Sequence, residues 1–574
     1  MTGPREQSFT KALFHGVIAE DLVSPFPTIP GEERDAVALL AADLRTLAKE
    51  GIDSRAIDET CRIPDSVRAE LGRRGLYGLT VPKAHGGLGL SCSAAARVFE
   101  ELGALDASLA VSVASHNCMG AWAIQTYGND EQKRRFLPDV ATGRRIVGFA
   151  LTERNAGSDG SSIEARSSLA DDGAGYVVDG EKIWITNGVY ADLFIVFART
   201  SSDKGHPRIT AFLVETGPGV TATPSPELVG VRGIGAATLR LDRVRVPFRN
   251  VLGDVGHGYA TGLEVLNWGR LGLSAAAVGG SRRLLADVTA RVTTRRAFRQ
   301  PIAEFGLTKD RIARMACETY AAQSIVRLTT GLMDSKVEDV ILESSICKIV
   351  ASETYAKHAD AATRIGAGIA FERGHPFERA LRDSRAHLVL AGTNEILLAF
   401  TALAGMQSPS AKIAEVNVAM RDPIKGLGIL TDFAVRRARS TFGRERLGFA
   451  HPAVRAEAVQ FEDGVLGLAR ESERVLRKHG TAIATRQFVQ RRIAEVTIDL
   501  FLLAAVLSRT TRTIDVRGEG AATRDIELTV GIGRLLGPRL RDRLQEMERE
   551  TDELLKSIAA RIYDDGGLEA DGDR

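Results

Sequence analysis

Several features that would assign this chain to a class at once are scarce or missing. Cysteine occurs only five times in 574 residues, and no two cysteines form a CxxC pair. This pattern excludes a disulfide framework and a CxxC zinc site, and it fits a reducing compartment. No uninterrupted apolar run approaches ~18 residues, so no membrane-spanning helix is predicted. The start, MTGPREQSFTKALF, lacks the apolar core of a signal peptide, so we expect none.

The chain also lacks an excess of either charge. Lys+Arg total 75 and Asp+Glu total 73, which gives a net charge of +2. We therefore expect no nucleic-acid partner. No G-x-G-x-x-G follows a strand and opens a helix, which argues against a Rossmann dinucleotide site. What remains is an ordinary globular composition, 44% hydrophobic and 26% charged, on a chain long enough for three or four domains.

Apolar residues follow helical spacing in the first quarter of the chain and again after Gly258. DAVALLAADLRTLAKEG predicts a helix that ends at Gly51, and SLAVSVASHNCMGAWAIQTYG is apolar enough to be a buried helix. In the second region a four-helix arrangement is predicted, with helices at 258–290, 305–334, 337–367 and 377–388 and another starting at Thr393.

Short β-type runs dominate between about Val147 and Asp254. LFIVFART, ITAFLVE and ATLRLDRVRVP are separated by turn residues, and Asp179-Gly180 has the composition of a type I′ hairpin turn. We expect a small antiparallel barrel. The predicted division is an N-terminal arm at 1–30, a helical domain at 31–146, the barrel at 147–255, a second helical domain at 256–408 and a C-terminal helical domain at 409–574.

Two stretches carry the clearest chemical signal, FALTERNAGSDG (149–160) and GEKIWITNG (180–188). The first is rich in small and hydroxyl residues, which allow close backbone approach and donate hydrogen bonds. The second places Trp184 and Thr186 two apart, so a strand would present both on one face. Together they predict a cradle for a flat polar ring; an ordinary hairpin beside a Gly-rich loop is the alternative.

LTE-x-x-AGSD followed by G-x-K-x-WITNG resembles the acyl-CoA dehydrogenase family. In its pattern, the chain most resembles the very-long-chain type, which has an extra C-terminal helical domain. The resemblance implies an α+β, mainly α fold: an N-terminal helical domain, a middle antiparallel β-barrel and a four-helix domain, followed by the extra helices. It also implies FAD as cofactor and an oxidoreductase that desaturates the α,β bond of an acyl thioester. In this reaction a carboxylate takes the α-proton while the flavin accepts the β-hydrogen as hydride.

Carried over by motif, the resemblance implies flavin-ring contacts from both stretches and diphosphate contacts from two later segments. RRAFRQPIAEFG is similar to the family's R-x-x-F-G segment, with Arg299 at the glycine, and RIGAGIAFERG is similar to Q-x-x-G-G-x-G, with Ala367 and Ala370 at two glycines. A solvated basic turn is the alternative for the first segment. The implied cofactor contacts are Phe149, Leu151, Thr152, Ser158, Trp184, Thr186, Arg295, Phe298, Arg364, Gly368, Thr393 and Glu395. The implied substrate contacts are Ser158, Asn267, Arg270 and Gly392; for Arg270, a surface arginine on an amphipathic helix is the alternative.

The catalytic carboxylate of the family is missing from AHLVLAGTNEILLAF. Where the family has an aromatic residue and Glu before GTN, this chain has Leu390 and Ala391. Some relatives place the carboxylate on the substrate-binding helix instead, and that position is Gly269 here. Because a methyl group accepts no proton, the catalytic residue stays unknown and little ordinary turnover is expected.

Neighbouring residues offer no clear replacement for this base. Thr393 is typical of an N-cap, and Glu395 would lie in the first helical turn, a structural position. His387 could be a base, but a packed or surface histidine is preferred. In the family the segment around His116 lines the acyl pocket, so Ser115, His116 and Met119 are weaker candidates; His116 is better explained as a core histidine.

Three functions remain open from the sequence. The first is oxidation of an acyl thioester, on coenzyme A or a carrier protein, with an unidentified proton acceptor. The second is flavin chemistry that needs no carboxylate, either oxygen-dependent or reductive. The third is a catalytically silent flavoprotein that binds acyl chains or serves as an assembly partner.

The resemblance also suggests partners and a location. A homodimer is expected, with electron-transfer flavoprotein or another acceptor. Residues 426–449 mix apolar residues with arginines and could lie on an anionic membrane surface or cover a helix bundle. We expect a cytoplasmic protein, with peripheral contact to the inner membrane face as a further hypothesis.

Overall fold

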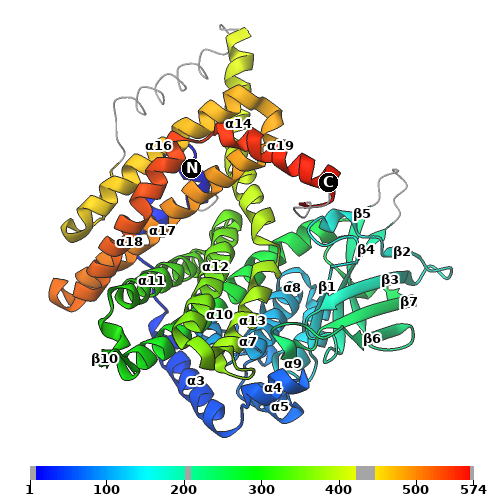
Figure 1. The fold of residues 1–574 in the computed structure, drawn as a ribbon. Coiled ribbons are helices and arrows are strands. Elements are labelled where there is room, and N and C mark those ends of the chain that lie inside the picture. The colour runs from blue at the N-terminus through cyan, green and yellow to red at the C-terminus, as the bar shows by residue number, and fades with distance from the viewer. Residues whose placement is uncertain (1–7, 201–207, 422–445, 569–574) are drawn as a thin grey trace, which may run out of the picture. The chain divides into compact units, whose positions relative to one another are not determined.

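The computed structural model describes residues 8–200, 208–421 and 446–568. The chain divides into two compact units (Figure 1). The described part of the first unit is Ser8 together with Val23–Leu397. The second unit comprises Phe9–Leu22 and the described residues from Leu398 onward.

In the first unit, helices precede and follow the sheet along the chain, and the sheet lies at one side of them (Figure 1). Before the sheet they are α3 (Gly31–Glu50), α4 (Ser54–Thr60), α5 (Asp65–Arg73), α6 (Cys92–Leu105), α7 (Ala107–Ser115), α8 (Trp122–Tyr127) and α9 (Asp130–Ala141). After the sheet they are α10 (Gly258–Thr294), α11 (Gly306–Asp334), α12 (Ile341–Gly366), α13 (Pro376–Val389) and α14 (Asn394–Arg421), the last of which runs past the division between the units. The helices predicted after Gly258 are confirmed to within a few residues.

One predicted helix contains an irregularity. Between α7 and α8, residues His116–Ala121 form a π-helical turn, η3. Such a turn inserts one extra residue per turn and redirects the side chains that follow, and it occurs often at functional sites. It places Cys118 against Gly272 and Met119 against Gly269, both on α10.

An eight-stranded sheet lies between the helical segments, with strand order β6-β7-β3-β2-β4-β5-β8 and β1 added beside β4. The strands are β1 (Val147–Ala150), β2 (Arg166–Leu169), β3 (Gly175–Ile185), β4 (Leu193–Thr200), β5 (Arg208–Glu215), β6 (Val220–Pro224), β7 (Ala237–Pro247) and β8 (Val251–Leu252). Neighbouring strands are antiparallel except for two parallel pairs, β1 with β4 and β2 with β4.

The hairpin predicted at Asp179-Gly180 is wrong. Strand β3 continues through both residues, with a register shift between Val178 and Gly180 where it pairs with β7. Gly180 has φ +148°, and a Cβ there would lie 2.6 Å from the Cβ of Ala165. Glycine is therefore needed at position 180 because of the bulge and the close approach to Ala165, not because of a turn. The turn between β2 and β3 lies around Gly173.

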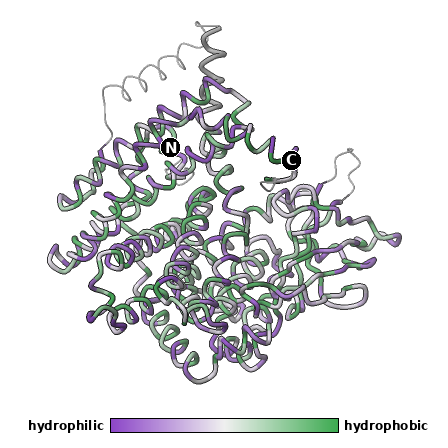
Figure 2. Tube along the Cα trace, in the orientation of Figure 1, coloured by the Kyte–Doolittle hydropathy of each residue, from purple (hydrophilic) through white to green (hydrophobic). Residues whose placement is uncertain are grey.

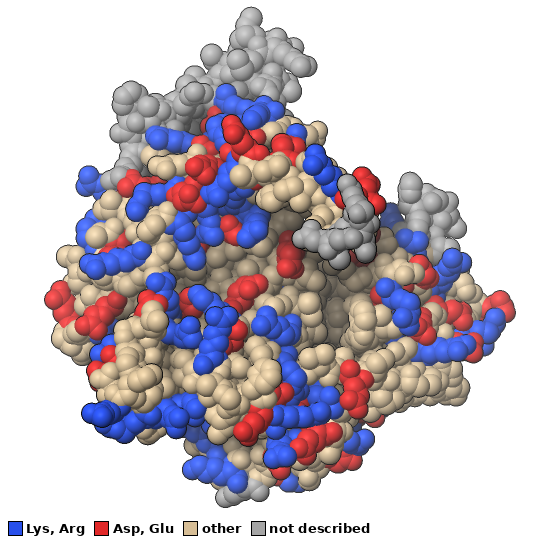
Figure 3. Space-filling view, viewed as in Figure 1, with Lys and Arg blue, Asp and Glu red and all other residues tan. Residues whose placement is uncertain are grey.

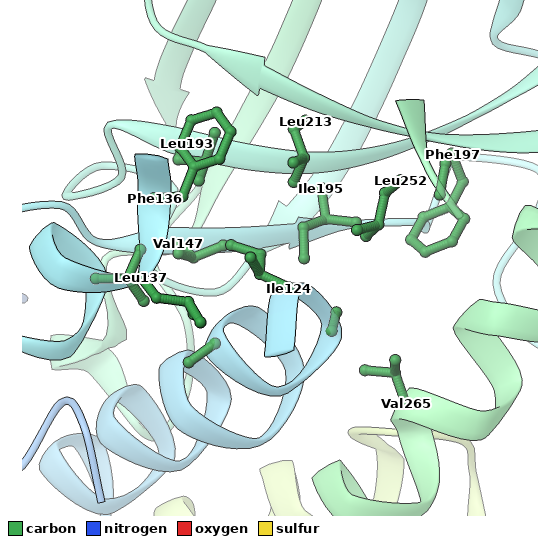
Figure 4. Packing of buried hydrophobic residues seen from close by; sticks show 14 of the residues in the cluster. Ile124, Phe136, Leu137, Val147, Leu193, Ile195, Phe197, Leu213, Leu252 and Val265 are labelled. Atoms are coloured by element: carbon green, nitrogen blue, oxygen red, sulfur yellow. The ribbon is translucent and has the colours of Figure 1, made fainter. Parts of the chain in front are cut away.

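A buried apolar cluster joins the sheet to the helices beneath it (Figure 4). Strand residues such as Ile195 and Leu213 pack against Ile124 of α8, Phe136 of α9 and Val265 of α10. Val147 of β1 and Val265 of α10 both belong to this cluster. Because the cluster is close-packed, it fixes β1, where the first motif begins, relative to α10, which carries Arg270.

The second unit is helical throughout its described part. Its helices are α1 (Phe9–Leu13), α2 (Glu20–Val23, of which Val23 belongs to the first unit), α16 (Arg455–His479), α17 (Gln487–Arg517), α18 (Glu519–Gln545) and α19 (Glu550–Asp565). Asp499 on α17 is buried and accepts hydrogen bonds from Arg539 and Arg543 on α18. Apolar and hydrophilic residues alternate along these helices (Figure 2), as expected for helices that are buried on one side.

The surface carries both signs of charge. Lys and Arg are interspersed with Asp and Glu over the face shown in Figure 3, in line with the net charge of +2. By length and composition alone, one helical stretch, Pro376–Gln407, is long and apolar enough to cross a membrane. That stretch contains the turn between α13 and α14, and core helices of soluble proteins meet the same criterion.

Candidate functional site

A buried ion pair joins the two motifs. The ammonium of Lys182 on β3 is fully buried and lies 2.6 Å from Glu153 Oε1, and it also donates to the carbonyl of Leu151 at 3.1 Å. The backbone N–H of Ile183 donates to the Thr152 carbonyl at 3.0 Å. These bonds hold the loop that follows β1 directly against β3.

Neither member of this pair was a predicted site residue. Glu153 also accepts hydrogen bonds from the backbone N–H groups of Glu164 and Ala165. Burial lowers the pKa of Lys182 to about 8. Each motif contains other charged residues, such as Arg154 in the first and Glu181 in the second, so the sequence alone does not single out Glu153 and Lys182 as a buried pair.

Trp184 projects outward from the end of β3. It is 58% exposed, between the buried residues Ile183 and Ile185, and its φ is +54°. A non-glycine residue in this region costs on the order of 1 kcal/mol, so the surrounding bonds must hold it there. The register of β3 against β7 shifts at the same point. The alternative of a buried strand aromatic is therefore excluded, and the indole presents a free face.

The second motif is anchored on its other side by Asn187. Its side-chain amide donates to the Ser112 carbonyl at 2.9 Å and accepts from the Ser112 hydroxyl at 2.5 Å. Its backbone N–H donates to Ile234, in the 3-10 turn η5 (Arg232–Ile234), at 2.9 Å. Thr186, the residue before Asn187, is partly buried. Through Asn187 the second motif connects the sheet to α7 and to η5.

The predicted cofactor contacts of the first motif lie on the end of β1 and on the loop that follows it. Phe149 is partly buried, with its ring 4.9 Å from that of Phe197, and Leu151 packs against the same core. Thr152 is partly buried, and Ser158 is exposed. A Cβ at Gly157 would meet nothing within 4 Å, so the backbone of this loop is open to a ligand.

The segment predicted to reach a dinucleotide is a short hairpin, β9 (Arg296–Ala297) and β10 (Gln300–Pro301), preceded by Arg295. Phe298 at its tip is 90% exposed. Arg299, at the position of the family's glycine, has φ +70°, the conformation that glycine adopts freely. The turn is retained despite the substitution, at the cost of local strain.

The second diphosphate segment lies where α12 ends. Arg364 is exposed and pairs with Asp360 at 2.9 Å. Ala370 is fully buried, so its methyl group faces the interior and does not narrow the exposed side. Ala367 is exposed with φ +54°, and a Cβ at Gly368 would meet nothing within 4 Å. Of the two alanines that stand where the family has glycine, only Ala367 therefore adds a methyl group to the open side of the loop.

The position of the missing base lies in the turn between α13 and α14. Ala391 has φ +56° and Gly392 has φ +102°, so the chain reverses sharply here. Thr393 accepts a hydrogen bond from the Ile396 N–H at 3.4 Å, as an N-cap does, and Glu395 is exposed in the first turn of α14. Glu395 thus lies where the helix dipole favours an acidic residue.

Apolar side chains pack against Ala391. Together with Leu390 it packs against a cluster that we call the Ala391 cluster, whose buried members come from α7, α10 and the segment around η5. These members are Ala107, Val111, Val231, Ile234 and Leu273.

Arg270 lies directly behind this turn. It is only 7% exposed; its Nε donates to the Ala391 carbonyl at 3.4 Å, and its Nη1 donates to Asn267 Oδ1 at 3.2 Å and to Ser345 Oγ at 3.3 Å. Burial lowers the pKa of Arg270 to about 10. The alternative of a surface arginine is wrong, because the helix face that carries Arg270 is turned inward.

The other position for a base is closed by packing. A Cβ at Gly269 would lie 2.9 Å from Cγ of Met119, on the π-helical turn η3. A carboxylate side chain at this position would require Met119 to move.

A second buried cation, which sequence reasoning missed, holds the same turn. The ammonium of Lys348 on α12 donates to the carbonyls of Leu388 at 2.9 Å and Gly392 at 2.7 Å, and to Asn394 Oδ1 at 2.8 Å. Burial, with a smaller contribution from Arg270, lowers the pKa of Lys348 to about 7. Its neighbours on the helix face are small residues, Ser344, Ser345, Ala351 and Ser352, so the sequence gives little sign that this lysine is buried.

The histidine candidates have packed positions. Both ring nitrogens of His116 are used, since Val147 N–H donates to Nδ1 at 3.2 Å and Nε2 lies 3.0 Å from the Val140 carbonyl. His387 is buried edge-on against Tyr355, and its Nδ1 has no described partner. Burial lowers the pKa of each histidine to about 4, so both rings are neutral at pH 7. The hydroxyl of Ser115 is also buried without a described partner.

The residues present fit the FAD that the resemblance implies. The exposed indole of Trp184 offers a face for a flat ring, and the open backbone at Gly157 and Gly368 leaves room for a close approach. Arg295 and Arg364 are exposed and carry the donors that suit a diphosphate.

Comparison with known proteins gives matches along most of the chain. Four family models match: acyl-CoA dehydrogenase N-terminal domain at 35–144, middle domain at 148–244 and C-terminal domain at 256–405, and the ACAD9/ACADV C-terminal domain at 452–568. The human very long-chain specific acyl-CoA dehydrogenase, mitochondrial, is 32% identical over 519 residues, which cover 88% of this chain and 79% of that protein.

Solved structures agree with these matches. An acyl-CoA dehydrogenase from Bacillus anthracis, complexed with FAD, superposes with a TM-score of 0.80 at 25% identity and covers 95% of this chain and 94% of its own. Butyryl-CoA dehydrogenase from Megasphaera elsdenii gives a TM-score of 0.62 at 30% identity, over 66% of this chain and 99% of its own. From its motifs, its fold and these matches, the chain belongs to the acyl-CoA dehydrogenase family.

Proposed function

We propose that this chain is a FAD-dependent oxidoreductase that acts on the α,β bond of an acyl thioester, on coenzyme A or a carrier protein, and that it lacks the usual glutamate base. The single observation that carries the second part is the position of Ala391. It occupies the turn between α13 and α14 with its methyl group against the Ala391 cluster. The alternate position, Gly269, is filled by Met119.

The chain's own residues have distinct tasks in this function. Bound FAD would supply the acceptor for the β-hydrogen. The Glu153–Lys182 pair fixes Leu151 and Thr152 beside Trp184, and these residues would hold the ring. The Ala391 cluster would exclude water from the thioester end of the site.

The absence of a positioned base predicts slow chemistry. General base catalysis contributes about 10²–10⁴-fold to rate, and none of the neighbours described above restores it. Glu395 is exposed on α14, and both nitrogens of His116 are occupied. We therefore expect FAD to bind normally and acyl-CoA to reduce it slowly.

Restoring the carboxylate tests this proposal. Ala391→Glu should raise the rate of anaerobic flavin bleaching by an unbranched acyl-CoA about 10²-fold or more. Ala391→Gln is the matched control, since it has the same size and accepts no proton. If Ala391→Glu binds FAD and ligand but bleaches no faster than Ala391→Gln, the missing-base account is wrong.

Flavin chemistry without a carboxylate is the second candidate. The hydrocarbon around Ala391 favours it, because an apolar pocket suits oxygen activation or hydride delivery in the reverse direction. Bleaching by NAD(P)H, or oxygen consumption without acyl-CoA oxidation, would support this candidate. A silent flavoprotein that binds acyl chains would show a ligand-induced spectral shift with neither reaction.

A homodimer fits the surface of the first unit. Phe298 is 90% exposed and Leu307 is 88% exposed, near each other in sequence on the β9–β10 hairpin and the start of α11. A second copy would cover this apolar surface. Phe298→Glu should shift the mass measured by light scattering from dimer toward monomer; an unchanged dimer would contradict this interface.

The remaining partners follow from the family. Electron-transfer flavoprotein or another acceptor would reoxidise the cofactor. Most of the segment proposed for membrane contact, 426–449, lies outside the described residues. We propose a cytoplasmic location with peripheral contact to the inner membrane face, which vesicle co-sedimentation of the full chain against a 426–449 deletion would test.

A further inference from the structure

Two buried cations flank the place where the family's carboxylate is missing. Arg270 is 7% exposed and Lys348 is 1% exposed. Among the residues that the structure describes, neither cation has a carboxylate within ion-pair distance: their hydrogen-bond partners are backbone carbonyls, amide oxygens and a serine hydroxyl. Buried charges are normally paired, because the cost of removing an ion from water is several kcal/mol.

The two cations are not equally satisfied. The ammonium of Lys348 has three N–H donors and makes three hydrogen bonds, so it is fully used by the turn between α13 and α14. The guanidinium of Arg270 has five N–H donors, but its hydrogen bonds use only Nε and Nη1. Its Nη2 group donates to no atom of the described residues. Arg270 is thus a nine-tenths buried cation with spare donors.

Arg270 faces the same space as Ala391. Leu273, one turn further along α10, packs in the Ala391 cluster, and Arg270 itself contacts the Ala391 carbonyl. Gly269, by contrast, faces Met119. The unused Nη2 donors of Arg270 therefore lie on the face of α10 that is directed toward Ala391.

We propose that the acyl thioester this chain binds carries a carboxylate on its acyl part, and that this carboxylate lies beside Ala391 and pairs with Nη2 of Arg270. Because Nε and Nη1 are already used, only the Nη2 group is left to donate to a carboxylate. A hydrogen bond between a guanidinium and a carboxylate is charge-assisted and therefore stronger than a neutral one. A free small carboxylate has the same chemistry and is the other possible source.

The inference rests on the proposed function only in taking an acyl thioester as ligand. It differs in what it predicts: the proposed function concerns a base that the chain lacks, whereas this inference concerns a charge that the ligand supplies. A binding measurement on the oxidised FAD-loaded protein separates them, because no turnover is needed.

The test compares methylmalonyl-CoA with isobutyryl-CoA by isothermal titration calorimetry. The two ligands differ only in a carboxylate against a methyl group. We expect methylmalonyl-CoA to bind at least about 10-fold more tightly, the value of one charge-assisted hydrogen bond. Arg270→Gln should abolish this preference while isobutyryl-CoA still binds.

A second variant covers the case in which Arg270→Gln does not fold. Ala391→Glu places the chain's own carboxylate in the same space, so methylmalonyl-CoA should bind at least about 10-fold more weakly than to the parent protein. Ala391→Gln controls for size. The two variants should bind isobutyryl-CoA with similar affinity.

Acetate tests the free source. If the two acyl-CoA ligands bind equally but acetate at millimolar concentration shifts the flavin spectrum of the parent protein and not of Ala391→Glu, the carboxylate comes from solution and the site stands. If the ligands bind equally and acetate has no effect, the inference is overturned. Faster flavin reduction by an unbranched acyl-CoA in Ala391→Glu would still support the proposed function.

Discussion

The ammonium of Lys182 lies 2.6 Å from a carboxylate oxygen of Glu153, with both side chains buried between the loop after β1 and strand β3. This one contact connects the two motifs that would hold the flavin ring. It also explains why a lysine can be fully buried in β3. Removing either partner would leave the other charge buried and unpaired.

Lys182→Met should therefore destabilise the first unit by about 3–5 kcal/mol, the usual cost of an orphaned buried charge. Thermal unfolding followed by circular dichroism measures the loss. Combining it with Glu153→Gln removes the second charge, keeps an oxygen that accepts from the backbone N–H groups of Glu164 and Ala165, and should recover most of the stability. A double variant as unstable as Lys182→Met would mean that packing, and not the unpaired charge, sets the cost.

Trp184→Ala should separate cofactor binding from stability. The indole is 58% exposed, so its removal should change the free energy of unfolding by less than about 1 kcal/mol. The loss of an aromatic contact should weaken FAD binding by about 10-fold, as measured by fluorescence of released flavin. Leu554→Ala is the control, since Leu554 in the second unit is 59% exposed and should affect neither quantity. Unchanged FAD affinity in Trp184→Ala would remove Trp184 from the cofactor site.

Gly269→Glu should fail as a route to a new base. A Cβ at this position lies 2.9 Å from Met119 Cγ, and overpacking of this kind costs about 1–3 kcal/mol. Adding Met119→Ala should relieve the cost, which the melting temperatures of the two variants would show. Equal melting temperatures would mean that Met119 already adapts.

His116 should make the fold sensitive to acid. Its pKa is about 4 in the folded chain, compared with an ordinary value of 6.5, because burial opposes the charged ring. Between these two values the unfolded chain binds more protons, so stability falls as the pH drops from 6.5 toward 4. This one group should cost about 2–3 kcal/mol at pH 4.5.

His116→Gln removes the titration and keeps an amide that can hydrogen-bond. The loss of stability between pH 7 and pH 4.5, measured by urea unfolding, should be smaller in this variant than in the parent. The remaining loss would include His387, whose pKa is also about 4. An identical pH dependence in variant and parent would contradict the assignment.

The sequence predicted the fold well where long stretches contain no proline. The helices α10 to α13 were placed within a few residues, because no proline interrupts α10, α11 or α12 and glycine or proline stands near their ends. The prediction of a hairpin at Asp179-Gly180 failed because the same dipeptide forms a bulge where Gly180 of β3 passes close to Ala165, in the loop before β2. Local composition cannot distinguish these two uses of glycine.

The candidate site was predictable only in part. The motifs alone were enough to locate Trp184 as a cofactor contact and Ala391 as the position of the missing base. The burial of Arg270 and Lys348, in contrast, depends on how α10 and α12 pack. A cation in a helical sequence is normally solvated, so sequence reasoning could offer a surface position for Arg270 equally well. The structure assigns both cations to the turn that carries Ala391.

Exchange of the α-proton of a bound saturated acyl-CoA with D₂O measures the missing base directly, since it requires proton removal but no flavin reduction. Followed by NMR, the parent protein and Ala391→Gln should show no exchange above the uncatalysed rate, while Ala391→Glu should exchange at least about 10²-fold faster. Exchange by the parent protein within tenfold of Ala391→Glu would show that another group removes the proton, and would contradict the account.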